Sequence, residues 1–191
     1  MKYLICILLC LTFACSKDET GYHVKQGENI FLPAMPTLPF FSKVLEFDLT
    51  LGDEWWEGEL TNPAGFGCKL HSVGKLNYHE GGANFAITYC LGHVYLSPRY
   101  YEPITKGTYK LYQLSYPTEL RPDVTVRCRI EFFDSTNFYV DGRLVVSIPV
   151  KLPHNWLSPP FLGSSGNDQN YPGDDIPSAW ASRNLGLEIT F

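Results

Sequence analysis

Strict alternation of apolar and polar residues is the feature that most constrains how this chain folds. In VTVRCRIEFF (residues 124–133), one set of alternate positions is apolar, namely Val124, Val126, Cys128, Ile130 and Phe132. Successive side chains of a β-strand point to opposite faces, so the pattern predicts a strand with one buried and one solvated face. The segments 43–51 and 184–191 repeat it, with Leu45, Phe47, Leu49, Leu185, Leu187, Ile189 and Phe191 expected to point inward.

Further strands are expected in NFAITYCL (84–91), GTYKLYQLSY (107–116) and STNFYVDGRLVVSIPV (135–150). The last contains Asp141–Gly142 between two β-rich runs, which predicts a tight hairpin because glycine tolerates the positive φ that the turn requires. No stretch repeats apolar residues at helical spacing, and 14 prolines and 16 glycines interrupt the chain. The sequence therefore predicts an all-β, antiparallel sandwich or barrel.

The N-terminus has the features of a lipoprotein signal peptide. Lys2 is followed by the apolar run 3–13, too short to span a bilayer, and then by Ala14–Cys15. We expect cleavage after residue 14, lipidation of Cys15 as the membrane anchor, and a tether over residues 15–21. The alternative is an ordinary secretory signal in which the cysteine is coincidental.

Residues 16–19 (SKDE) resemble the acidic export tag of lipoproteins of Bacteroidota. That resemblance implies an outer-membrane protein, lipid-anchored at the cell surface; the alternative is a solvated charged linker. The formal net charge is −5, and no run is rich in lysine or arginine, so a nucleic-acid partner is not expected. Residues 22–191 are expected to form a single domain, with aromatic residues (15% of the chain) supplying much of its core.

Three cysteines follow the tether, Cys68, Cys90 and Cys128. In an oxidising compartment, Cys68 and Cys90 are a candidate disulfide pair. Cys68 and His71, like Cys90 and His93, also have the spacing of zinc ligands. Residues three apart on an extended strand face opposite sides, however, so zinc is the less favoured interpretation.

The whole pattern resembles the concanavalin-A-like jelly roll shared by laminin-G domains, many lectins and several glycanase families. The motifs that carry the resemblance are LEFDLTL (45–51), FYVDGRLV (138–145), the Gly- and Asp-rich segment after that hairpin and the final strand. GYHVKQGENIF (21–31) and ITKGTYKLYQ (104–113) resemble Bacteroidota surface lipoproteins with such a domain. The resemblance implies two stacked sheets whose concave face or rim loops bind glycans.

Jelly-roll glycanases cleave with acids arranged as Glu-x-Asp-x-x-Glu on one strand. Glu46 and Asp48 match the first two positions, but Leu51, or Leu49 in the shorter spacing, stands where the third acid is needed. Without a catalytic pair, retaining hydrolysis has no route. We therefore expect Glu46 and Asp48 to be solvated residues of an exposed strand face.

Aromatic residues in loop-like settings are the candidate ligand contacts. Sugar rings stack on exposed aromatic side chains, while neighbouring polar groups bond their hydroxyls. The alternative is that these rings pin loops onto the sandwich, since tryptophan is mostly buried. The candidates are Trp55, Trp56, Tyr100, Tyr101, Trp156 and Trp180.

The segment 151–182 is expected to be a long irregular loop, and such loops are often functional. It contains oxygen ligands that suit calcium, although acidic residues are also ordinary turn formers. The candidate ligands are Asn167, Asp168, Asp174 and Asp175.

The sequence thus favours a non-catalytic surface lipoprotein that binds an extracellular polysaccharide or oligosaccharide. One alternative is a glycan-cleaving enzyme of the jelly-roll class, either a glycanase or a polysaccharide lyase. The other is an adhesion module that binds protein, or a subunit of an outer-membrane complex.

Overall fold

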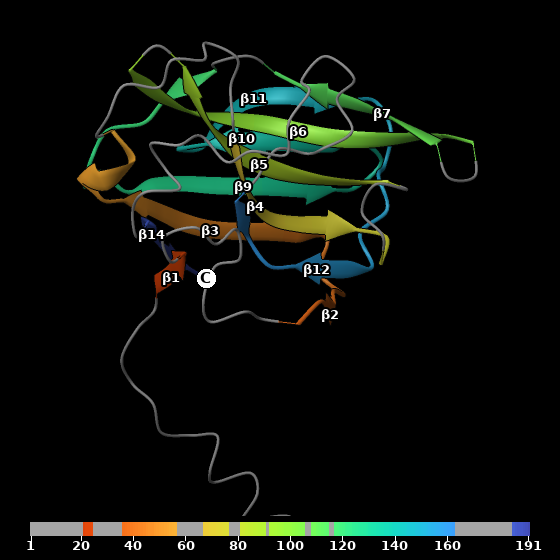
Figure 1. Ribbon diagram of the computed structural model, residues 1–191. Helices are drawn as coiled ribbons and strands as arrows, with labels where there is room; N and C mark the ends of the chain where they lie inside the picture. The colour runs from red at the N-terminus through yellow and green to blue at the C-terminus, as the bar shows by residue number, and fades with distance from the viewer. Residues whose placement is uncertain are drawn as a thin grey trace, which may run out of the picture.

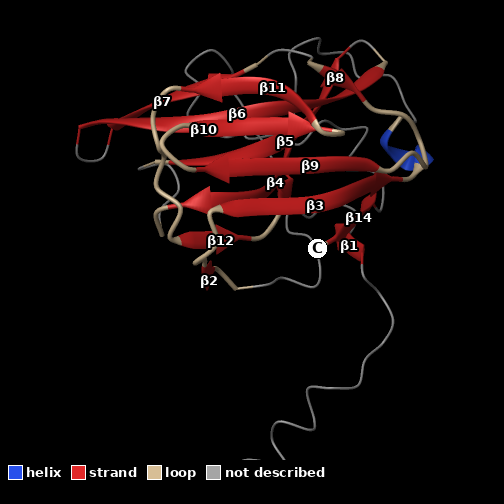
Figure 2. Ribbon diagram, turned by 180° about the vertical axis from the view of Figure 1, so that it is seen from behind, coloured by secondary structure: helices blue, strands red, loops and turns tan. Residues whose placement is uncertain are grey.

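The computed structural model describes residues 21–24, 36–56, 67–76, 81–90, 92–105, 108–114, 117–162 and 185–191. Their strands form two antiparallel sheets packed face to face (Figures 1 and 2). The one helical element described is a 3₁₀ turn, η1 (Asp53–Trp55). None of the described residues forms a helix long and apolar enough to cross a membrane.

The first sheet joins segments that are far apart in the chain. Its strand order is β1 (Gly21–Val24), β14 (Leu185–Thr190), β3 (Val44–Leu51), β9 (Val126–Phe132), β10 (Thr136–Val140) and β11 (Arg143–Ile148). The C-terminus consequently lies beside β1 (Figure 1).

The second sheet is built around four consecutive long strands. Its order is β2 (Leu38–Pro39), β12 (Trp156–Ser158), β4 (Gly67–Gly74), β5 (Gly82–Cys90), β6 (His93–Thr105) and β7 (Thr108–Gln113). Two short strands complete it: β13 (Phe161–Leu162) pairs with β4, and β8 (Thr118–Glu119) pairs with β6.

The chain passes repeatedly between the sheets: β3 is in the first, β4–β8 in the second, β9–β11 in the first, β12–β13 in the second and β14 in the first. Strands that are neighbours in space are therefore often distant in sequence, as in jelly rolls. The predicted fold class, an all-β antiparallel sandwich of the jelly-roll type, is confirmed.

The core lies between the sheets and follows the predicted alternation. Leu45, Phe47 and Leu49 are at most 2% exposed, and the Cys128 side chain opposite Phe47 is fully buried. The prediction fails at two strand ends. Val124 is 49% exposed because β9 begins only at Val126, and Phe191 is 65% exposed because it follows the last paired residue of β14.

The Asp141–Gly142 hairpin is confirmed. It joins β10 to β11 with φ values of 49° at Asp141 and 75° at Gly142, so both residues are left-handed as a type I′ turn requires. Asp141 also fixes the turn to the sheet, since its Oδ1 accepts a hydrogen bond from the Arg127 amide at 2.9 Å.

Two other predictions are wrong. Part of the expected loop 151–182 forms strands β12 and β13, while residues 163–182 lie outside the described part. The Cys68–Cys90 disulfide does not form, because Cys68 is a free, buried thiol. Cys68 pairs with Ile87, so Cys90 lies three residues, or roughly 10 Å, further along β5.

Candidate functional site

The outward face of the second sheet, which we call the polar face, is the strongest candidate site. The inward face of β4–β6 belongs to the hydrophobic core through residues such as Leu70, Phe85 and Leu96. Residues at the alternating positions, including Asn84 and Arg99, point away from the first sheet. In Figure 1 the second sheet lies toward the viewer.

Strand pairing arranges the polar face in rows that cross the sheet. A central row contains Ser158, Ser72, Asn84, Arg99 and Gln113. On one side of it lies the row Trp156, Gly74, Gly82, Tyr101 and Leu111. On the other side lie the rows Phe161, Lys69, Ala86 and Ser97, and then Thr88, Tyr95 and Glu119. A bulge in β4 between Lys69 and Ser72 keeps these two side chains on the same face.

A chain of hydrogen bonds fixes the arginine of the central row. The Gln113 carbonyl oxygen accepts bonds from Arg99 Nε at 3.0 Å and Nη2 at 2.5 Å. The amide nitrogen of Gln113 in turn donates to Thr88 Oγ1 at 3.1 Å. Because Gln113 is neutral, it fixes the guanidinium of Arg99 without balancing its positive charge.

Several polar groups on this face are buried without a hydrogen-bond partner. Asn84 and Ser97 are 0% exposed and Ser72 is 1% exposed. Among the described residues, both side-chain polar atoms of Asn84 and the hydroxyls of Ser72 and Ser97 lack a partner. Buried polar groups are nearly always bonded, so a cluster of exceptions on one face indicates a place for a polar ligand or water.

Lys69 lies in the row next to Arg99 and is 7% exposed. Burial, together with the charge of Arg99, lowers the pKa of the Lys69 amine to about 7. Its Nζ lies 5.9 Å from the centre of the Phe161 ring. The polar face therefore combines an arginine cation, an amine that is partly protonated at neutral pH, neutral amides and hydroxyls.

The end of the polar face near β8 carries an exposed ionisable pair. His93 Nδ1 lies 2.7 Å from Glu119 Oε1, and both side chains are about half exposed. The ring of Tyr95 lies beside that of His93, with the centroids 6.1 Å apart. Four residues of β6, roughly 13 Å, separate Tyr95 from Arg99.

The structure places only some of the predicted aromatic residues on the polar face. Tyr101 lies on it, 1% exposed, with its ring edge-on to Tyr109. Trp156, half-buried in β12, belongs to the same row. Tyr100 points the other way and stacks on Tyr112, with the ring centres 4.5 Å apart.

The structure places the two adjacent tryptophans in different settings, with Trp55 fully buried and Trp56 only partly so. Trp55 is 0% exposed, and its Nε1 donates to the Gly186 carbonyl at 2.7 Å, so it belongs to the core. Trp56 is half-buried and packs against the same core. The prediction of Trp55 as a ligand contact is therefore wrong, because the η1 turn directs its side chain against β14. Trp180 lies outside the described residues.

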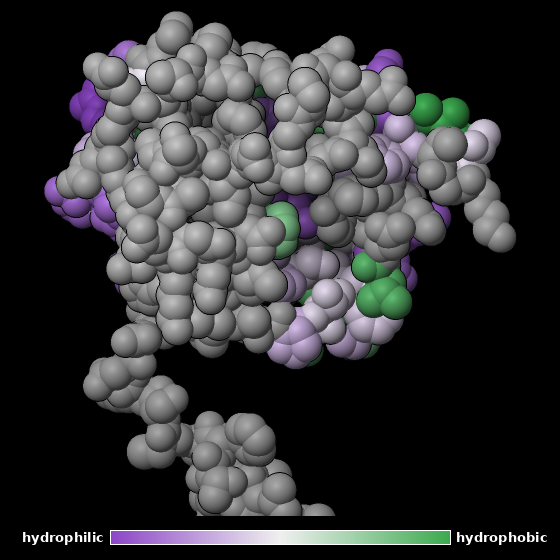
Figure 3. Space-filling view, in the orientation of Figure 1, coloured by the Kyte–Doolittle hydropathy of each residue, from purple (hydrophilic) through white to green (hydrophobic). Residues whose placement is uncertain are grey.

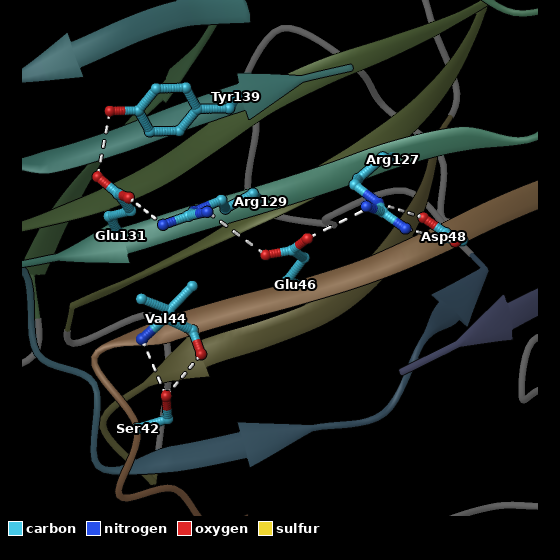
Figure 4. Close-up of polar contacts among 8 residues, drawn as sticks. All are labelled: Ser42, Val44, Glu46, Asp48, Arg127, Arg129, Glu131 and Tyr139. Carbon is cyan, nitrogen blue, oxygen red and sulfur yellow. Dashed lines mark hydrogen bonds and ion pairs between the residues drawn. The ribbon is translucent and has the colours of Figure 1, made fainter. Parts of the chain in front are cut away.

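Glu46 and Asp48 lie on the outer face of the first sheet, away from the polar face. Asp48 accepts bonds from Arg127 at 3.0 and 3.3 Å, and these hold the pKa of its carboxyl below the usual range. Glu46 lies within 3.7 Å of Arg127 and 3.6 Å of Arg129. Figure 4 shows these ion pairs running along β3 and β9 and ending at Glu131 and Tyr139. The structure confirms the expectation that Glu46 and Asp48 lie on a solvated strand face.

The described residues contain no cluster of three or more His, Cys, Asp or Glu side chains that could hold a metal. His71 is buried and bonded to Tyr22 and Ser158, which leaves it unavailable to a metal shared with Cys68. The candidate calcium ligands Asn167, Asp168, Asp174 and Asp175 lie outside the described residues, as does Cys15.

Sequence reasoning missed the polar face itself. One signal was present: the segment GANFAITYC (82–90) contains no charged residue, although its alternation leaves one face outside the core. An ordinary solvated face would carry charges, as β9 does with Arg127, Arg129 and Glu131. Outward positions filled with Asn, Ser, Thr and Ala instead indicate a covered polar surface.

Comparison with known proteins yields similarities of fold. No family model matches the chain, and no curated protein matches it. Among solved structures, BuGH16Bwt is 8% identical, with 88% of this chain and 72% of that chain covered and a TM-score of 0.45.

Two further structures have similar values. An inactivated mutant of β-agarase B in complex with agaro-octaose is 10% identical, with 80% of this chain and 67% of that chain covered and a TM-score of 0.40. An endo-β-1,4-glucuronan lyase from the fungus Trichoderma reesei is 10% identical, with 91% and 75% covered and a TM-score of 0.44. Similarity at this level concerns the arrangement of strands and assigns no function to this chain.

Proposed function

We propose that this chain binds an extracellular glycan on the polar face, without cleaving it. The observation that carries the proposal is the set of buried polar atoms of Asn84, Ser72 and Ser97 that lack a partner among the described residues. Sugar hydroxyls both donate and accept hydrogen bonds, so one glycan can satisfy an amide and several hydroxyls together. The described residues, and not the distant structural similarity, support this proposal.

Aromatic rings on the same face suit a carbohydrate. Trp156 and Tyr101 lie in one row, and the residues between them, Gly74 and Gly82, have no side chains. A segment of several sugar rings lying along this row, which is roughly 14 Å long, would meet an aromatic side chain at each end. The small exposed fractions of the central residues mean that binding has to open this face to the ligand.

Cleavage is the second candidate function. Tyr101 favours it, because an ionisable phenol stands on the polar face. Burial raises the pKa of Tyr101, and the charge of Arg99 partly opposes that shift. A phenol that keeps its proton could act as a general acid. New reducing ends or unsaturated products would support this candidate over simple binding.

We also propose that a lipid on Cys15 holds the domain at the outer surface of the outer membrane. The support is the sequence pattern of residues 2–19, which lies outside the described part of the structure. Growth with a radiolabelled fatty acid should label the protein, and Cys15→Ser should abolish the label. A labelled C15S variant would contradict this anchor.

Asn84→Ala tests the proposed site. We expect glycan affinity to fall about tenfold, since the ligand loses up to two hydrogen bonds. The free energy of unfolding should stay the same or rise, because the substitution removes a buried amide that lacks a partner. Affinity electrophoresis of the full-length protein in gels containing a polysaccharide panel gives the first quantity, and urea unfolding gives the second.

Asn137→Ala is the matched control. Asn137 lies on the outer face of the first sheet, where its Oδ1 accepts a bond from Ser147 at 2.6 Å. This variant should bind as the parent does. Equal retardation of the parent, N84A and N137A would place the binding site elsewhere. If no glycan retards the parent protein, the proposed function is contradicted.

A further inference from the structure

The charge on the polar face points to the class of its ligand. Lys69 on β4 and Arg99 on β6 lie in adjacent rows, on either side of β5, and each is 7% exposed. The charge of Arg99, together with burial, lowers the pKa of the Lys69 amine. Burial disfavours the charged form of a side chain, and an anion bound beside Arg99 and Lys69 would favour the positive form of both.

No carboxylate stands opposite Arg99 among the described residues. Its Nε and Nη2 groups donate to the neutral side chain of Gln113. Strands β4–β7 contain a single acidic residue, Glu102, which lies at an alternating position on the other face and accepts a bond from Tyr112 at 2.8 Å. Glu119 lies at the far end of the polar face, beyond Tyr95.

Neutral polar side chains lie in the same row as the arginine. Asn84 is the direct neighbour of Arg99 across the β5–β6 pair, and Ser72 is the next residue in the row. Their amide and hydroxyl groups lack partners among the described residues. A guanidinium with an adjacent amide donor is well suited to the paired oxygens of a carboxylate or sulfate group.

We propose that the polar face selects an acidic glycan, whose carboxylate or sulfate group binds between Arg99, Lys69 and Asn84. This inference rests on the proposed function and specifies its ligand. Non-specific attraction would not produce such selectivity, since the whole chain has a net charge of −5. The selectivity therefore depends on these local cations.

The test compares acidic glycans with neutral counterparts of the same backbone. Binding of the full-length protein is measured by isothermal titration with polygalacturonate and its methyl ester, and with dextran sulfate and dextran. We expect at least one acidic member to bind about tenfold or more tightly than its neutral partner. Preference for polygalacturonate identifies a carboxylate as the bound group, and preference for dextran sulfate identifies a sulfate.

Arg99→Gln should remove most of this preference, while the matched variant Arg127→Gln should keep it. Arg127 has the same side chain but is paired with Asp48 on the outer face of the other sheet. If R99Q destabilises the protein in urea unfolding, Lys69→Met replaces it as the test of the same cationic pair.

The outcomes separate the two proposals. Tight binding of a neutral glycan that depends on Asn84, with no preference for acidic forms, would overturn this inference and leave the proposed function intact. Failure to bind any glycan would overturn both. An acidic preference that R127Q weakens as much as R99Q would also overturn the inference, because it would show attraction to surface charge in general.

Discussion

Trp55→Ala is expected to lower the free energy of unfolding by about 3–5 kcal/mol, the largest effect of any substitution considered. The indole is fully buried at the end of the η1 turn. Its removal leaves a cavity and deprives the Gly186 carbonyl of a bond of 2.7 Å. Because Gly186 belongs to β14, the substitution also loosens the C-terminal strand. Urea unfolding followed by circular dichroism measures the change.

Trp56→Ala is the matched control for this prediction. Trp56 is the next residue, has the same side chain and is only half-buried against the core, so its replacement should cost clearly less. A small, equal loss for the two variants would contradict the assignment of Trp55 to the core. Loss of glycan binding by W55A without loss of stability would restore its role as a ligand contact.

Acidification is expected to destabilise the protein through His71, by about 2 kcal/mol between pH 7.5 and pH 5. His71 is 0% exposed and lies between the two sheets, with its ring edge-on to those of Tyr22 and Phe47. Its Nδ1 lies 3.1 Å from the Ser158 carbonyl, which can only accept, so Nδ1 carries the proton. Nε2 is then the acceptor for the Tyr22 hydroxyl at 3.0 Å.

The direction of this pH effect follows from the pKa of His71 in the folded and the unfolded protein. Burial lowers the pKa of His71 from 6.5 to about 4 in the folded protein. Below pH 6.5 the unfolded chain binds a proton at this residue while the folded protein does not. Unfolding therefore becomes easier as the pH falls from 6.5 toward 4, and this contribution changes little below pH 4.

His71→Asn isolates the effect, since an asparagine amide can still donate to Ser158 but does not titrate in this range. The variant should be less stable than the parent at pH 7.5, with a smaller loss between pH 7.5 and pH 5. Urea unfolding at the two pH values gives the loss of stability on acidification for each protein. Equal losses for the parent and H71N would contradict a buried neutral His71.

Local patterns were sufficient to predict the strands and the hairpin. The alternation around Phe47 and Cys128 arises because one face of each strand is buried and the other is solvated. This pattern can be recognised within a few consecutive residues. The Asp141–Gly142 turn likewise depends only on the conformational freedom of two residues. The fold class could therefore be predicted without knowing which strands are neighbours.

The candidate site could not be predicted in the same way, because it depends on pairing between distant segments. Trp156 shares a row with Tyr101 only because β12 pairs with β4, β4 pairs with β5, and β5 pairs with β6. Asn84 and Arg99 are fifteen positions apart in sequence, and neither belongs to a recognisable motif. The error at Trp55 has a similar origin, since its partner Gly186 lies near the other end of the chain.

Hydrogen–deuterium exchange of the full-length protein, with and without the glycan that retards it most strongly, tests the central claim most directly. Binding on the polar face should slow amide exchange in β4, β5 and β6, around Ser72, Asn84 and Arg99, and leave β3, β9 and β10 unchanged. Protection centred on β3 and β9, beside Glu46 and Arg127, with none in β4–β6, would contradict it.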